Sequence, residues 1–131
     1  MKVEINVHPN KKILLSSFEK FEDGSGGAFL EIKSGRFSYY NEMFCFDDLA
    51  RFTEELKQMY ELLSGSTELR FHYESEYIKF ESTSLGHIEI TGEFLEYGQI
   101  QQKLSFGFEF DQSYLPNLIR QLEIVVKEVY I

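Results

Sequence analysis

The sequence predicts an α+β protein, with a twisted antiparallel sheet of about eight strands and two helices packed on one face of the sheet. Short segments in which apolar and polar residues alternate recur between turn residues, and strands joined by short turns pair antiparallel. Two segments with helical spacing of apolar residues follow, one in the middle of the chain and one at its end. Phe and Tyr make up 16% of the chain, and both residues favour strands.

The chain also repeats itself. Residues 27–32 return in similar form at residues 92–97, and Phe44-Cys45-Phe46-Asp47 returns as Phe108-Glu109-Phe110-Asp111. A helical pattern follows each Phe-x-Phe-Asp segment. We therefore expect a single domain, 1–131, made of two ββββα halves, 1–65 and 66–131.

In the first half, Val3, Ile5 and Val7 alternate with polar residues and predict a strand that ends at Pro9-Asn10. Further strands are expected at 13–21, 29–33 and 37–46. The last of these changes phase, which a bulge near Tyr40-Asn41 would explain. A helix should then begin at Asp47 as its N-cap and end at Ser64-Gly65. Its apolar stripe consists of Leu49, Phe52, Leu56, Met59 and Leu63.

The second half follows the same plan. Alternation predicts strands that carry Leu69, Phe71 and Tyr73, then Ile78 and Phe80, then Ile88 and Ile90, with a bulge at Gly92. The clearest strand contains Leu104, Phe106, Phe108 and Phe110, which we expect to be buried together with Leu118 and Leu122. Asp111 or Ser113 should cap the last helix, and Pro116 suits its first turn. The apolar face of this helix consists of Leu115, Leu118, Ile119, Leu122, Val125, Val126 and Val129.

Charge and composition exclude several classes of protein. The net charge of −9 disfavours binding to nucleic acid phosphates and suits either a basic protein partner or simple solubility. The single cysteine, Cys45, excludes an internal disulfide and a cysteine-based zinc site, and is expected to be a small core residue. No segment resembles a signal peptide or a membrane span. We expect a cytoplasmic protein with no membrane partner.

Most candidate chemical groups have a structural explanation. Asp23-Gly24-Ser25-Gly26-Gly27 lacks the later ligands of a calcium loop, so a hairpin loop is expected there. Capping accounts for Asp47-Asp48 and for Asp111. The three histidines, His8, His72 and His87, lack metal-ligand spacing, and no serine or cysteine has a catalytic context. We therefore expect no catalytic residues, no metal and no cofactor.

One polar segment suggests contact with a partner. Tyr73-Glu74-Ser75-Glu76-Tyr77 places two acids and two aromatic rings at a hairpin tip. The segment can be a solvated turn or an acidic, aromatic contact patch, a composition that suits protein interfaces. The predicted partner-binding residues are Tyr73, Glu74, Glu76, Tyr77 and Glu81.

Two stretches carry a family resemblance. They are Leu-Glu-Ile-Lys-Ser-Gly and Phe-Asp-Asp-Leu-Ala-Arg-Phe-Thr-Glu-Glu-Leu between Leu30 and Leu63, and the closing Phe-Glu-Phe-Asp-Gln-Ser-Tyr-Leu-Pro. The chain resembles the WapI-type family of small bacterial proteins that are grouped with immunity proteins. The resemblance implies a non-enzymatic cytoplasmic protein that binds and blocks the toxic C-terminal domain of a contact-dependent toxin, typically a nuclease.

Two functional hypotheses follow. The first is a protein-binding module, specifically an immunity protein with a basic toxin domain as its partner. The alternative is a small-ligand-binding protein or a minor enzyme that uses a cavity between sheet and helices.

Overall fold

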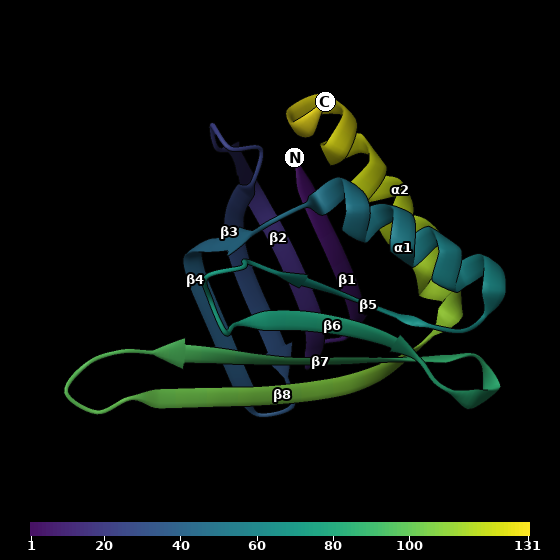
Figure 1. Cartoon of the computed structure of the whole chain (residues 1–131). Helices are drawn as coiled ribbons and strands as arrows, with labels where there is room; N and C mark the ends of the chain where they lie inside the picture. The colour runs from purple at the N-terminus through teal and green to yellow at the C-terminus, as the bar shows by residue number, and fades with distance from the viewer.

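The computed structural model describes residues 1–131 and contains two four-stranded antiparallel sheets and two α-helices (Figure 1). The strand orders are β1-β2-β3-β4 and β5-β6-β7-β8. This arrangement confirms the α+β class, the eight antiparallel strands and the two helices. The elements are β1 Lys2–His8, β2 Lys11–Lys20, β3 Gly26–Ser34, β4 Phe37–Phe46, α1 Leu49–Leu62, β5 Ser66–Arg70, β6 Tyr77–Ser82, η1 Ser84–Gly86, β7 His87–Glu96, β8 Gln102–Asp111, η2 Gln112–Tyr114, α2 Leu115–Val125 and η3 Val126–Tyr130.

The strands form two sheets instead of one, and α1 connects β4 of the first sheet to β5 of the second. The two sheets meet here through a backbone hydrogen bond from Asp47 N to Arg70 O (3.0 Å). In Figure 1 the strands of one sheet cross those of the other steeply, and α1 and α2 lie side by side against β5 and β1. The Gln121 side chain accepts from Glu4 N (2.8 Å) and donates to Glu4 O (3.2 Å). This contact covers the edge of β1, which would otherwise be open for pairing.

The two halves of the chain have the same element order. The repeated segments begin in β3 and β7, and in β4 and β8, which occupy the same positions in their sheets. Superposition of the halves, and thus a true structural repeat, remains a prediction.

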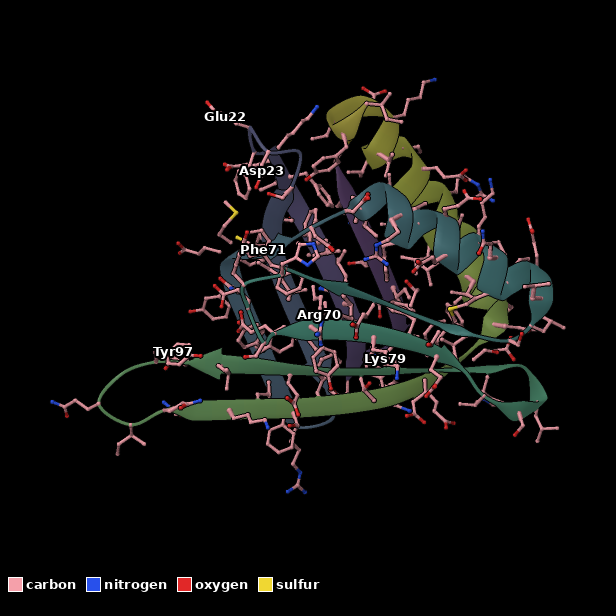
Figure 2. All side chains as sticks on the ribbon, viewed as in Figure 1. Glu22, Asp23, Arg70, Phe71, Lys79 and Tyr97 are labelled. Carbon is pink, nitrogen blue, oxygen red and sulfur yellow. The ribbon has the colours of Figure 1, made fainter.

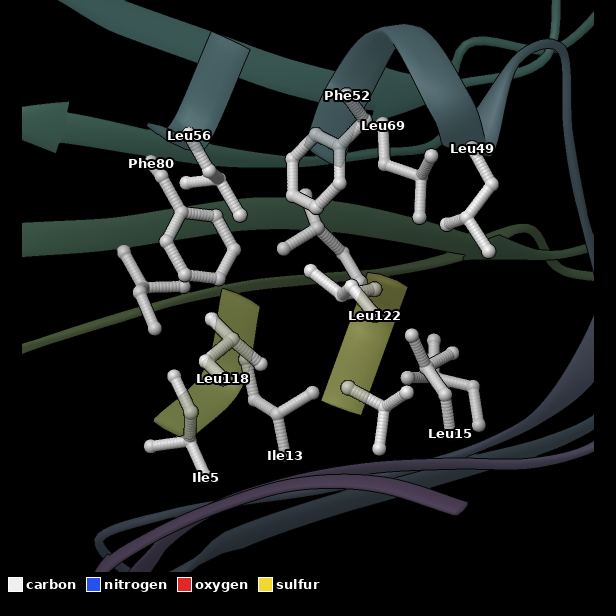
Figure 3. Packing of buried hydrophobic residues seen from close by; sticks show 14 of the residues in the cluster. Ile5, Ile13, Leu15, Leu49, Phe52, Leu56, Leu69, Phe80, Leu118 and Leu122 are labelled. Carbon is white, nitrogen blue, oxygen red and sulfur yellow. The ribbon is translucent and has the colours of Figure 1, made fainter. Parts of the chain in front are cut away.

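The buried hydrophobic side chains form one cluster of 28 residues that draws on both sheets and both helices. Figure 3 shows Phe52 and Leu56 of α1 and Leu118 and Leu122 of α2 converging on strand residues such as Ile13. The predicted burial of Phe106, Phe108, Phe110, Leu118 and Leu122 is confirmed. Leu104 is only half-buried, because it lies where β7 and β8 extend beyond β6.

The helix starts differ in part from the prediction. Asp48, and not Asp47, is the N-cap of α1, because its backbone is extended and its carboxylate accepts from Arg51 N (2.9 Å). Asp47 accepts instead from Asp48 N (2.8 Å). Asp111 accepts from Ser113 N (2.8 Å) and caps the short turn η2, from which α2 continues.

Four further details refine or correct the sequence analysis. Leu63 is exposed and left-handed (φ 54°), so α1 ends before Ser64-Gly65. The β4 irregularity lies between Asn41 and Phe44, beside the predicted position near Tyr40-Asn41. Gly92 pairs in register without a bulge, and a side chain there would collide with the Phe106 ring. Cys45 is half-exposed, since Phe44 and Phe46 take the inward positions of β4.

Candidate functional site

The connection between β5 and β6 presents two of the predicted partner-binding residues to solvent. Tyr73 is 85% exposed, and Glu74 beside it is also exposed. Glu74 N donates to Phe71 O (3.0 Å), and the Phe71 and Tyr73 rings meet edge to face with their centroids 5.5 Å apart. These contacts give the turn a defined shape, so Tyr73 and Glu74 can meet a partner at low entropic cost.

Glu76 has a structural role instead. Its carboxylate accepts from Leu95 N (3.0 Å), a group beyond the point where β6 stops pairing with β7. Burial and the nearby Glu76 carboxylate raise the pKa of Tyr39 to about 12. Tyr77 is half-buried, and its ring centroid lies 5.3 Å from the Arg70 guanidinium carbon. Glu76 therefore supplies a hydrogen-bond acceptor to β7 beyond the end of β6, and only part of the Tyr77 ring is accessible to a partner.

Glu81 lies away from this turn, at the other end of β6. Four residues of extended chain separate it from Tyr77 by about 13 Å. Glu81 stands opposite Glu89 of β7, and Glu89 stands opposite Glu109 of β8. Paired residues share a face of the sheet, and the alternating residues Phe80, Ile90 and Phe108 are buried. The three glutamates, which we call the glutamate row, therefore occupy the outer face of the second sheet.

The glutamate row concentrates negative charge on this face. Glu81 has an ion pair with Lys79 (3.9 Å), whereas Glu89 and Glu109 have none. Like charges directly opposite one another destabilise a sheet, so a cationic partner would relieve their repulsion. The sequence analysis identified Glu81 but missed Glu89 and Glu109, because only the strand register brings the three together.

A polar cleft of about 530 Å³ opens beside the exposed turn. Asp47 lines this cleft, with its carboxylate 3.5 Å from His72 Nε2 and 3.5 Å from Arg51 Nη2. Ser25 donates its hydroxyl to the Asp23 carboxylate, which lowers the pKa of Asp23. A carboxylate with a lowered pKa is a weak base, so Asp23 would activate the Ser25 hydroxyl poorly as a nucleophile. The lining residues are Asp23, Ser25, Asp47, Asp48, Arg51, Phe71, His72 and Tyr73.

The space between sheets and helices is nearly filled. A cavity of about 20 Å³ remains there, lined by ten hydrophobic residues that include Phe52, Phe80 and Leu118. This volume is about that of one water molecule, and its walls offer no polar partner. The chain contains no cluster of three or more His, Cys, Asp or Glu residues that could hold a metal ion, and no helix able to span a bilayer.

Comparison with known proteins shows which family the chain belongs to. No curated protein and no solved structure matches the chain. The model of the WapI-like immunity protein family matches residues 19–129, a span that includes both helices, strands β3 and β4 of the first sheet and the whole second sheet. The chain therefore belongs to the WapI-like immunity protein family.

Proposed function

We propose that this protein is a cytoplasmic, non-enzymatic immunity protein that binds and neutralises the toxic domain of a contact-dependent bacterial toxin. Its partner is a basic protein domain, which it meets through the exposed turn residues Tyr73 and Glu74, the Tyr77 ring and the glutamate row. Glu76, one of the predicted interface residues, contributes by fixing the base of this surface.

The glutamate row is the observation that carries this proposal. A net charge of −9 attracts a cationic partner over a distance, and the exposed Glu81 and Glu109 and the half-buried Glu89 concentrate part of that charge on the outer face of the second sheet. Electrostatic complementarity of this kind raises the association rate more than the affinity. Membership of an immunity protein family independently supports a protein partner.

The test is association kinetics with the toxic domain encoded beside this gene, together with protection of cells that produce that domain. The wild-type association rate should fall as salt rises, since a Debye length of about 8 Å screens exposed charges at physiological ionic strength. Glu89→Lys should lower that rate at least several-fold. Glu31→Lys on the outer face of the first sheet is the matched control and should change it little.

Failure of the wild-type protein to bind the toxic domain or to protect cells would refute the immunity function. Equal association rates for the two variants would instead remove the glutamate row from the interface. Glu74→Lys tests the exposed turn in the same way. Glu76→Lys would not, because it also removes the hydrogen bond to Leu95 N.

The alternative, a small-ligand-binding protein or minor enzyme, required a chamber between sheet and helices. The 20 Å³ apolar cavity found there cannot hold a substrate or cofactor. No observation favours this alternative over protein binding.

A further inference from the structure

The hairpin formed by β7 and β8 is longer than its neighbour. Pairing between β6 and β7 ends at Tyr77 and Glu93, whereas β7 and β8 remain paired as far as Glu96 and Gln102. The loop 97–101, which we call the hairpin tip, follows. Figure 1 shows this ribbon projecting from the body of the molecule, and Figure 2 shows Tyr97 at the same end as Phe71 of the exposed turn.

The base of the hairpin is held firmly. The Phe94 side chain is buried, and its ring stacks on Tyr39 with a centroid distance of 4.3 Å and on Phe106 with one of 5.8 Å. The Glu76 carboxylate holds Leu95 N at 3.0 Å, in place of the missing β6 partner. A projecting element with a fixed base loses little conformational freedom when it binds.

The hairpin tip differs in chemistry from the rest of the surface. Residues 97–102 contain no charged side chain, although 27% of the chain is charged. Tyr97 is 72% exposed and Ile100 is 79% exposed. Carboxylates lie next to the tip, on Glu93 and Glu96, with Lys103 paired to Glu93 at 3.3 Å. The element therefore has a neutral, partly apolar end and an acidic base.

We propose that the hairpin tip inserts into a concave site of the partner, with Tyr97 and Ile100 against its floor and the carboxylates at the hairpin base facing a rim of Lys and Arg. This inference rests on the proposed immunity function. It adds that the protein blocks a concave site of the toxic domain. A neutral tip can enter such a cleft without desolvating a charge of its own, while acids that remain at the rim keep their attraction. The Glu76–Leu95 hydrogen bond also joins the base of the hairpin to the chain segment that follows the Tyr73–Glu74 turn.

A double variant, Tyr97→Ser with Ile100→Ser, tests the inference. Both side chains are exposed, so the variant should unfold at the wild-type urea concentration. Against the catalytically inactivated toxic domain encoded beside the gene, its Kd should rise about 10- to 100-fold through faster dissociation, as for buried anchor residues. The salt dependence of association should stay unchanged. The matched control is Leu62→Ser with Leu85→Ser, two exposed leucines outside the hairpin, and it should bind as the wild type does.

Amide hydrogen exchange on the wild-type complex gives a second measurement that does not depend on a variant. Residues 97–101 should become protected when the toxic domain binds. If the wild type binds tightly but the tip variant binds equally well and the tip gains no protection, the inference is wrong and the immunity function stands. If the wild type does not bind at all, the proposed function itself fails. If the tip variant loses only self-association, a second copy occupies the tip and the inference is also overturned.

Discussion

The two sheets share a strand order but have different outer faces. On the first sheet, Lys12 lies 3.9 Å from both Glu4 and Glu31, so acids and bases are interleaved. On the second sheet, Glu89 stands between Glu81 and Glu109. Packing constrains only the inward positions of a strand, and the outward positions are free to diverge. Both outer faces hold ion pairs, but only the second has acids directly opposite one another, so one topology can carry two faces of different charge pattern.

The last hairpins of the two sheets, β3–β4 and β7–β8, also differ in what they present to solvent. β3 and β4 are joined through Gly35-Arg36, and this end of the first sheet packs against the second, with Ser34 Oγ donating to Gly107 O (3.3 Å). The β7–β8 hairpin instead projects, with its apolar tip exposed. Both candidate contact surfaces of the second sheet therefore lack a counterpart in the first.

The largest expected effect tests what the two halves have in common. Phe44 and Phe108 occupy equivalent places in the repeat, and both are buried. Phe44→Ala and Phe108→Ala should each reduce the free energy of unfolding by about 3–5 kcal/mol, through lost burial and a residual cavity. Urea unfolding measures both. A change below about 1 kcal/mol in either variant would contradict its place in the core.

A smaller effect should separate the two helix starts. Asp48→Ala removes the cap of α1 and should cost about 1 kcal/mol, as N-cap losses do. Asp111→Ala should cost less, because Asp111 caps only η2 and α2 begins without a side-chain cap. Thermal unfolding of the two variants under identical conditions compares them. A larger loss of stability in Asp111→Ala than in Asp48→Ala would show that Asp111 is the more important cap.

Removal of one negative charge should change the stability of the protein differently on the two outer faces. Glu89→Gln relieves repulsion from Glu81 and Glu109, and we expect it to stabilise the protein by roughly 0.2–1 kcal/mol. Glu31→Gln removes an ion pair with Lys12 and should be neutral or destabilising by less than about 1 kcal/mol. Urea unfolding at low salt resolves the difference, which should shrink when salt is added. Equal changes in stability for the two variants would show that repulsion within the glutamate row does not destabilise the protein.

The last prediction concerns alkaline pH. Burial, with Glu76 near Tyr39 and Glu19 near Tyr130, raises the pKa of both phenols from 10.0 to about 12. The folded protein therefore holds these protons more tightly than the unfolded chain does. Their stabilisation is complete below about pH 10 and is lost as pH rises towards about 12. Tyrosinate absorbance should show two late-titrating residues, and Tyr130→Phe, which also loses the bond to Glu19 O, should remove one of them.

The sequence alone determined the elements and the inward faces of this protein. Alternation placed Phe106, Phe108 and Phe110 in the core, and helical spacing placed Leu118 and Leu122 against them, because burial follows local periodicity. Predictions of finer features were wrong where two neighbouring residues could fill the same structural role. Asp47 and Asp48 can both cap a helix, and the extended backbone at Asp48 decides between them.

Only the tertiary structure decided how these elements form surfaces. The division into two sheets depends on which strands pair, and the glutamate row depends on strand register across three strands. The sequence predicted the same role, partner binding, for Glu76 and Tyr73. In the structure the Glu76 carboxylate accepts a hydrogen bond from Leu95 N of β7, whereas the Tyr73 side chain faces solvent. Local sequence specifies which side of a strand faces inward, but contacts between residues distant in the chain determine which outward residues lie together.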